Sequence, residues 1–302
     1  MKDSRDPSAA IPVTIFATTK AFRGHFAVIQ RNAITSWSRI APKVGVILMG
    51  DSPGTAEICK ELGLLHIRDV ASNQSGAPRL DDLFAKAEDA VPEGLLCYVN
   101  ADIMLTDDFS RAAQRVAGLS PLMMIGRRWD TDIAEPWDFQ ALDWQDRLRT
   151  TAHTQGKLAG AGAVDYFLFS KGLGRNLLPF AVGRPYWDHW MVWNALRHGA
   201  TLVDASDLVM AVHQNHDYSH HPAGRPGVWD SEEAKKNRRL AGDSSRLLTI
   251  DDVRFRLTPE GLQPRYLHVW RTVRYSWRHP RAFVKFLGRS LIKLVAKRNA
   301  KA

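Results

Sequence analysis

The sequence predicts an α/β fold in which helices flank a mostly parallel central sheet. Apolar runs of strand length alternate with segments of helical periodicity through the first third of the chain. These runs are apolar at nearly every position, which is typical of strands covered on both faces. Polar clusters follow several of the runs directly. Because parallel strands end at one edge of a sheet, the clusters predict a ligand site at that edge.

The first half of the chain alternates between predicted strands and helices. We expect helices over 25–40, 55–62 and 80–90. The first helix is supported by apolar residues close to helical spacing, namely Phe26, Ile29, Ala33, Trp37 and Ile40. Strands are predicted over 12–18, 43–49, 64–67 and 94–99, so that one helix lies between each two successive strands.

The second half has a mixed pattern. Short strands are expected over 122–126, 163–170, 201–204 and 208–212. Residues 127–149 are rich in Trp and Asp and are expected to form a loop with a short helix. A further helix is predicted over 188–197, and a polar helix or lid over 228–242. We expect residues 1–11 to be disordered and residues 263–302 to form a basic helical tail. Between them, 12–110 should form the nucleotide-sugar half of one domain and 111–262 its acceptor and metal half.

Composition limits the class of protein. The chain has 302 residues, of which 45% are hydrophobic, so it has too much apolar content for a disordered protein. Two cysteines, Cys59 and Cys97, are too few for a disulfide framework and are expected to be buried and reduced. No signal peptide and no apolar run of about 18 residues are visible. We therefore expect a cytoplasmic protein.

The positive charge is concentrated at one end of the chain. The formal net charge is +9, and eleven of the 41 Lys and Arg residues lie in 264–302, which contains no acid. The remaining 30 basic residues are matched by 32 acidic ones. The tail also carries apolar residues near helical spacing, among them Trp270, Trp277 and Leu287. Pro280 should divide the helix in two.

This pattern predicts a helix that lies on an anionic membrane surface, at the inner face of the cell membrane. The alternative is a helix that packs on the protein's own core. Nucleic acid is not an expected partner, because the rest of the chain shows no basic patch and no recognised motif.

Asn100 and Asp102 follow the apolar strand predicted over 94–99. A carboxylate at a strand end can hold Mn²⁺ or Mg²⁺, which readily bridges to a diphosphate. The amide of Asn100 can bond a ribose hydroxyl. By itself, an N-x-D sequence after a strand is also typical of an ordinary turn.

Four histidines and an aspartate lie within 213–221. Imidazole suits Mn²⁺, Zn²⁺ or Fe²⁺, and His213 is the best anchored because it ends a short apolar strand, with His216 next. A surface loop with incidental histidines is the alternative, and we favour it for His220 and His221.

Aromatic residues surround an acid in 186–193. Trp187 and Trp190 share a helical face and could stack on a sugar ring, while Asp188 could deprotonate a sugar hydroxyl. A core helix capped by Asp188 explains the pattern equally well. Arg79, at a predicted helix start, could meet a phosphate together with backbone N–H groups, although a solvated Arg is the commoner outcome.

Taken in order along the chain, these segments resemble the nucleotide-diphospho-sugar transferase superfamily, the GT-A glycosyltransferases, over about 12–221. Runs such as 31–37 and 98–103 resemble a poorly characterised branch found in bacteria and plants. The resemblance implies a GT-A-like sheet that binds a nucleotide sugar, and a D-x-D motif that binds the metal. The sequence departs from that motif at its first acid, which is Asn100 here.

The resemblance implies a role for each candidate residue. Thr18 and Thr19 would border the base pocket, and Asp51 and Arg79 would contact the nucleoside or diphosphate. Asn100 and Asp102 would take the D-x-D place, His213 or His216 would complete the metal shell, and Asp188 would act as the base. Acceptor binding is expected from Trp187, Trp190 and Asp165.

The expected function is transfer of a sugar from a nucleotide-diphosphate donor to a glycan or lipid-linked acceptor, of the kind found in cell-surface polysaccharide. Two alternatives stay open: a metallohydrolase built on the cluster 213–221, and a binding protein that has kept the fold without catalysis.

Overall fold

The structure is a computed structural model that describes residues 10–217 and 224–265. The chain divides into two compact units, Met1–Gln263 and Pro264–Ala302. Almost all of the expected basic tail lies outside the described residues, as do His220 and His221.

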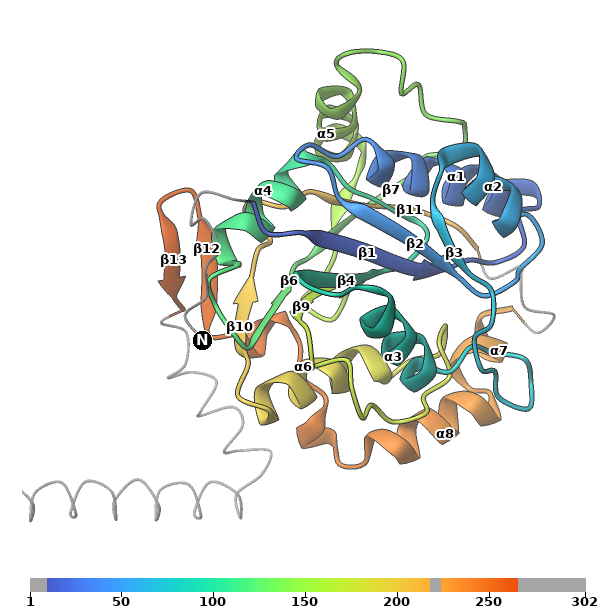
Figure 1. The fold of residues 1–302 in the computed structure, drawn as a ribbon, viewed down its shortest axis with the longest axis vertical. Coiled ribbons are helices and arrows are strands. Elements are labelled where there is room, and N and C mark those ends of the chain that lie inside the picture. Colours follow the sequence, from blue (N-terminus) through green and yellow to red (C-terminus); the bar gives the residue numbers. More distant parts are fainter. Residues whose placement is uncertain (1–9, 218–223, 266–302) are drawn as a thin grey trace, which may run out of the picture. The chain divides into compact units, whose positions relative to one another are not determined.

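A mostly parallel sheet forms the centre of the first unit (Figure 1). Within the described residues it has nine strands in the order β13-β12-β10-β6-β9-β4-β1-β2-β3. The strands of the first half are β1 (Val13–Thr18), β2 (Gly45–Met49), β3 (Leu65–Ile67) and β4 (Leu95–Val99). All neighbouring pairs among these four are parallel. The α/β class expected from the sequence is confirmed.

The second half of the chain extends the same sheet. Its strands are β6 (Leu122–Ile125), β9 (Tyr166–Ser170), β10 (Thr201–Asp204), β12 (Phe255–Thr258) and β13 (Gly261–Pro264). Strand β9 lies antiparallel between β4 and β6, whereas β10 is parallel to both β6 and β12. The start of β9 therefore meets the end of β4. Asp165 directly precedes β9 and Asn100 directly follows β4, so these two residues lie side by side.

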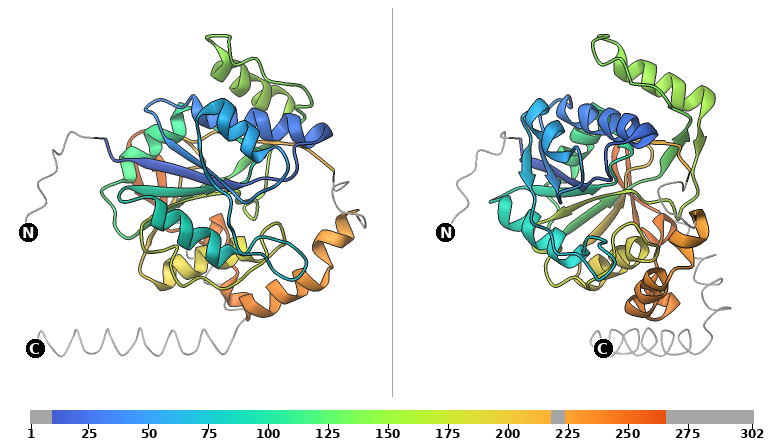
Figure 2. Two further views of the ribbon diagram at one scale, coloured as in Figure 1. Left: turned by 45° about the vertical axis from the view of Figure 1, so that its right-hand side comes forward. Right: turned by 90° about the vertical axis from the view of Figure 1, so that its right-hand side faces the viewer.

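Helices cover both faces of the sheet (Figure 2). Helices α1 (Gly24–Ser38), α2 (Thr55–Leu62) and α4 (Asp107–Val116) pack on one face, and α3 (Leu80–Ala90) and α6 (Trp187–Arg197) on the other. Side chains alternate between the two cores, as strand geometry requires: Ile15 and Ala17 of β1 join the first core, and Phe16 joins the second.

A second, four-stranded sheet lies beside the first, in the order β5-β11-β7-β8. Its strands are β5 (Ile103–Met104), β7 (Arg128–Thr131), β8 (Lys157–Leu158) and β11 (Ala211–Gln214), and α5 (Trp144–Gln155) packs against it. The expectation of a loop with a short helix over 127–149 is wrong at its start, because residues 128–131 form strand β7. Strand β7 escaped notice because it is short and only its last residue is buried.

The described chain continues into α7 (Gly224–Trp229) and α8 (Glu232–Ala241), which occupy the place of the single polar helix expected over 228–242. The side chain of Asn237 anchors α8, because it bonds the backbone N–H of Ala181 and the carbonyls of Ala181 and Pro185. No helix in the described parts of the chain is both long and apolar enough to cross a membrane.

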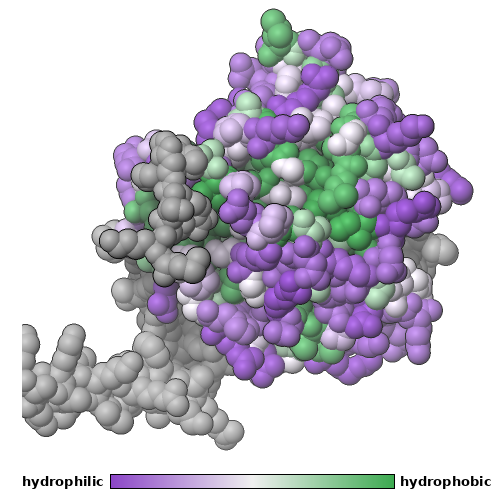
Figure 3. Space-filling view, viewed as in Figure 1, coloured by the Kyte–Doolittle hydropathy of each residue, from purple (hydrophilic) through white to green (hydrophobic). Residues whose placement is uncertain are grey.

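One sheet edge carries exposed apolar surface. Figure 3 shows an apolar area over β2 and the edge strand β3, where Leu65 is 52% exposed.

Cys59 and Cys97 are free and buried, as expected.

Candidate active site

A cavity of about 660 Å³ opens at the carboxyl ends of β1 and β4. Its position follows from the parallel sheet, where loops that leave neighbouring strands meet at one edge. The structure brings eight of the residues expected from the sequence into its wall. They are Thr18, Thr19, Asn100, Asp102, Asp165, Asp188, His213 and His216.

Asp102 lies in the tight turn between β4 and β5, which is closed by a hydrogen bond from the N–H of Ile103 to the carbonyl of Asn100. Its Oδ2 lies 3.1 Å from Nε2 of His216 and 3.9 Å from Nε2 of His213. Burial by itself raises the pKa of Asp102, but the His216 hydrogen bond and the charges of both histidines and Lys20 outweigh it, so the pKa lies well below its usual range.

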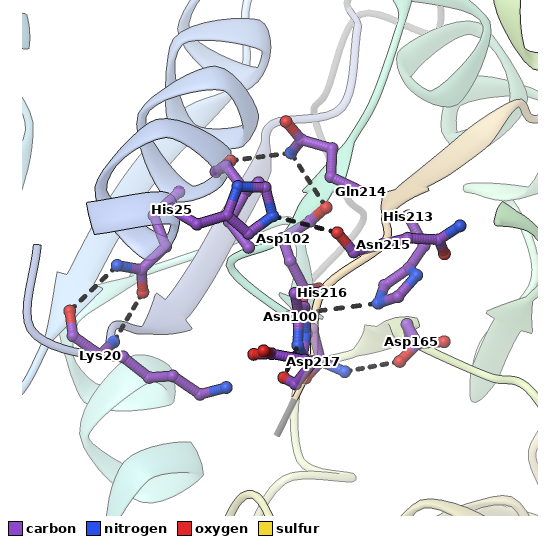
Figure 4. Close-up of polar contacts among 12 residues, drawn as sticks. Lys20, His25, Asn100, Asp102, Asp165, His213, Gln214, Asn215, His216 and Asp217 are labelled. Atoms are coloured by element: carbon purple, nitrogen blue, oxygen red, sulfur yellow. Dashed lines mark hydrogen bonds and ion pairs between the residues drawn. The ribbon is translucent and has the colours of Figure 1, made fainter. Parts of the chain in front are cut away.

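Strand β11 positions the two histidines. It pairs antiparallel with β5, so His213 is the register partner of Ile103, one residue beyond Asp102. Three residues later, His216 packs its ring on Phe26 at 5.2 Å between centroids. Figure 4 shows both imidazoles among the side chains around Asp102.

These three residues fit a divalent metal. One ligand atom from each of Asp102, His213 and His216 lies within 4.8 Å of the others. The Oδ1 atom of Asp102 is buried and has no hydrogen-bond partner in the structure, so it is available to a cation. Two imidazoles and one carboxylate suit Mn²⁺, Fe²⁺ or Zn²⁺ better than Mg²⁺, which prefers oxygen ligands.

A chain of polar and charged side chains braces the site. Asn100 donates its side-chain amide to Oδ1 of Asp165 at 2.6 Å, and its backbone N–H bonds the Asp165 carbonyl at 3.0 Å. Arg128 donates to Oδ2 of Asp165 at 2.6 Å and to Oδ1 of Asp130 at 2.8 Å. Asp130 in turn lies 3.1 Å from Nδ1 of His213. The brace therefore connects Asn100 to a candidate metal ligand.

The end of β1 supplies another wall. The hydroxyl of Thr19 bonds that of Thr55 at 2.6 Å, and Thr18 bonds the side chain of Tyr98. Lys20 follows directly and also lines the cavity. The two threonines thus sit beside the cavity with their side chains engaged in the protein.

Asp188 enters the cavity wall from the first turn of α6. Tyr186 precedes that helix in a left-handed conformation, with φ of 85°, which is strained for a residue with a side chain. The Oδ1 atom of Asp188 is buried without a hydrogen-bond partner in the structure. Burial raises the pKa of Asp188 above its usual range. A carboxylate of this kind is a stronger base than an exposed one.

Arg184 and Trp229 line the cavity from the second half of the chain. Glu233 of α8 accepts from Arg184 at 2.9 Å and also bonds Asn73 and Ser75. The start of α8 is therefore connected to two loops of the cavity wall. Trp229, at the end of α7, is 45% exposed.

Four expected site residues do not line the cavity. Asp51 is exposed and pairs with Arg68 at 3.0 Å, and Arg79 pairs with Asp81 at 2.5 Å. Trp187 and Trp190 are 5% and 4% exposed and belong to the second core, where Trp187 packs on Tyr98 and Trp190 on Phe180.

Sequence reasoning missed several residues of the cavity wall and of the brace. Arg128 and Asp130 alternate along β7, and this two-residue spacing could have indicated a strand with one polar face. Lys20 belonged to a polar cluster after β1 but received no role. Arg184 and Trp229 carry no local signal, because distant segments bring them to the cavity.

No protein-family model and no curated protein matches the chain. Solved structures do show likeness. A mannosyltransferase from Pyrobaculum calidifontis, in complex with GDP-Man and Mn²⁺, is 14% identical with a TM-score of 0.41, over 70% of this chain and 59% of that one. TarS 1–349 from S. aureus, in complex with UDP-GlcNAc, is 11% identical with a TM-score of 0.47, over 70% and 60%.

A glucosyl-3-phosphoglycerate synthase from Mycobacterium tuberculosis, in complex with Mg²⁺ and UDP, is 10% identical with a TM-score of 0.44, over 78% of this chain and 79% of that one. The chain thus spans about three fifths of the first two proteins. With identities and TM-scores this low, the proposed function rests on the geometry of the site.

Proposed function

We propose that this protein is a metal-dependent glycosyltransferase that moves a sugar from a nucleoside-diphosphate donor to a hydroxyl group of a glycan or lipid-linked acceptor. The observation that carries the proposal is the convergence of Asp102, His213 and His216 in a 660 Å³ cavity at the carboxyl edge of the sheet. A large cavity with few convergent polar groups is typical of a small-molecule site.

The residues present suit the parts of such a reaction. Asp102, His213 and His216 would hold Mn²⁺, which when bound offsets charge on a leaving diphosphate. The donor would lie along the cavity wall that Thr18, Thr19 and Asn100 form. These three residues are the base and ribose candidates. Asp51 and Arg79 could contribute only through a movement of their loops or through a longer donor.

Asp188 is the candidate base. In a direct displacement the acceptor oxygen forms the new glycosidic bond while the bond from the anomeric carbon to the diphosphate breaks. The hydroxyl proton then passes to Asp188, whose raised pKa favours this transfer. Asp165 lines the same cavity and is a candidate acceptor contact, and Trp229 adds an aromatic surface there.

A membrane-bound acceptor is supported by the sequence of 264–302, with eleven basic residues and no acid. We propose that this segment binds anionic membranes. In a flotation assay, the full chain should float with vesicles that contain phosphatidylserine, and a chain ending at 263 should stay at the bottom. Flotation of both, or of neither, would contradict a role for the tail.

The test of the proposed function is thermal unfolding with a panel of nucleoside diphosphates and nucleotide sugars, each with and without Mn²⁺. A ligand at 100 times its Kd adds about 2.7 kcal/mol of stability, which shifts Tm by a few degrees. The expected shift requires both one nucleotide and the metal. It should be absent in Asp102→Asn and present in Asp146→Asn, where the acid is exposed and distant from the cavity.

A metallohydrolase is the second candidate, because two histidines and a carboxylate can bind a metal without any nucleotide. A shift with Mn²⁺ or Zn²⁺ alone, unaffected by any nucleotide, would favour it. No shift in Tm with any combination of nucleotide and metal would overturn both proposals and leave a binding protein without catalysis.

A further inference from the structure

The backbone of Lys20, which lines the cavity, is bonded on both sides of its peptide unit. Its backbone N–H donates to Oε1 of Gln30 at 2.6 Å, and its carbonyl accepts from Nε2 of the same side chain at 3.0 Å. Gln30 is buried in α1. This two-way clamp fixes the direction in which the Lys20 side chain leaves the main chain.

The amine of Lys20 lies in the cavity near acidic residues but is paired with none of them. Its Nζ sits 4.4 Å from the centre of the Phe26 ring. Among the described residues, no ion pair joins it to a carboxylate. Figure 4 shows the side chain extending in the direction of the side chains around Asp102. Although solvent reaches the side chain, surrounding protein lowers its pKa, and the nearby Arg184 adds to this effect.

Arg184 is a further cation in the wall of the same cavity. It reaches Glu233 and the carbonyl of Gly183, but its Nε is buried and has no partner in the structure. The wall thus carries three cationic side chains, Lys20, Arg128 and Arg184, and among the described residues only Lys20 has no acidic partner. The amine of Lys20 and the unpartnered Nε of Arg184 can therefore both donate to an anion in the cavity.

The candidate metal ligands indicate why a cationic side chain besides the metal would help to bind a diphosphate. Asn100 stands where a second carboxylate would otherwise help to hold the metal, so Asp102 is the single acid among the candidate ligands. A metal held by one acid binds less tightly before the nucleotide arrives. A lysine that meets the diphosphate directly would add charge stabilisation that the metal shell lacks.

We infer that Lys20 is a diphosphate-binding residue, which holds the anionic group of the donor together with the metal at Asp102. The inference rests on the proposed function, and it names a residue for the diphosphate in place of Asp51 and Arg79. It also predicts two effects of opposite sign. Removal of the Lys20 charge weakens nucleoside-diphosphate binding, but strengthens binding of Mn²⁺ alone, because a cation no longer opposes the metal beside Asp102.

The experiment is isothermal titration of the full chain and of Lys20→Met, with Lys60→Met as a control on the exposed side of α2. The probes are Mn²⁺ alone, then UDP, GDP and their parent nucleosides in saturating Mn²⁺. A bond to a charged group corresponds to about a tenfold to hundredfold loss in affinity for the diphosphates. The parent nucleosides should bind both proteins equally, and Mn²⁺ alone should bind Lys20→Met more tightly.

The outcomes separate the two claims. If the full chain and Lys60→Met bind a diphosphate with Mn²⁺ and Lys20→Met binds it equally well, the inference fails and the proposed function stands. If the full chain binds no nucleoside diphosphate, both fail. Equal losses for the diphosphate, the nucleoside and Mn²⁺ in Lys20→Met would show a structural role instead, and would also overturn the inference.

Discussion

Nδ1 of His213 lies 3.1 Å from Oδ1 of Asp130, its register partner across the parallel pair β7–β11. The contact leaves Nε2 of His213 on the side of Asp102. A carboxylate at the far nitrogen of a metal-binding histidine orients the ring and raises its basicity. The Asp130 contact and the Asp102 charge outweigh burial and raise the pKa of His213.

Asp130→Asn should weaken Mn²⁺ binding by about tenfold to hundredfold, because the ring of His213 loses its orienting partner. Electron paramagnetic resonance of Mn²⁺ measures the affinity without any turnover. The matched control is Asp132→Asn, which removes the same charge two residues further along, where the side chain is exposed and accepts from Asn215. Equal losses in the two variants would mean that overall charge, and not the contact with His213, governs the affinity.

Asp188→Asn should lower the rate of sugar transfer by about a hundredfold or more, since loss of a general base removes a factor of roughly 10² to 10⁴. Nucleotide binding should survive, because the proposed donor contacts, Thr18, Thr19 and Asn100, lie at the ends of β1 and β4. Radiolabelled transfer and nucleotide titration on one sample check both statements. Transfer at the rate of the unmodified protein would remove Asp188 from the reaction.

The same residue predicts a dependence on pH. Burial raises the pKa of Asp188 in the folded protein above its unfolded value of about 3.9. Stability linked to this group is therefore greatest while Asp188 is protonated, and falls as pH rises from the unfolded pKa through the folded pKa. At neutral pH, Asp188→Asn should thus melt at a higher temperature than the unmodified protein, although it is less active. A lower Tm at pH 7 would contradict a raised pKa of Asp188 in the folded protein.

Gln214 should matter for folding and for the site together. It is fully buried, donates to the carbonyls of Ile29 and Asp102, and accepts from Asn32. Gln214→Leu removes these three buried hydrogen bonds, and a typical internal hydrogen bond contributes about 0.5–1.5 kcal/mol, so urea unfolding should show a loss of about 1.5–4.5 kcal/mol. Gln140→Leu, on the exposed loop before α5, should cost almost nothing. A loss under about 0.5 kcal/mol, the smallest contribution expected from one such hydrogen bond, would show that water replaces the amide.

The tryptophans should divide into two kinds. Trp187→Ala should destabilise the fold by about 3–5 kcal/mol, because it opens a cavity beside Tyr98 and Phe167. Trp229→Ala should leave the unfolding free energy nearly unchanged but raise the KM for a sugar substrate, because an exposed ring in the cavity can stack on a pyranose. The reverse pattern would restore Trp187 as the aromatic contact for the acceptor.

The first-half alternation of strands and helices was predictable because uniformly apolar runs with helical segments between them have few other solutions. The same rule placed Thr18, Asn100 and Asp102 at one edge. It could not distinguish them from Asp51, which also follows a strand of that sheet but pairs with Arg68 outside the cavity. Direction after a strand end depends on the loop, and loop conformation is not encoded in hydrophobic periodicity.

The sequence by itself determined the fold class, the strand-end acid Asp102 and the histidines that follow a short strand. Three-residue spacing put Trp187 and Trp190 on one helical face, but only packing decided that this face is core. Likewise, only the register of β7 against β11 placed Asp130 beside His213, and only the fold brought Lys20 and Arg184 into one cavity. These contacts join segments far apart in the chain, so no local pattern carries them; they exist because the sheet pairs strands that the sequence separates.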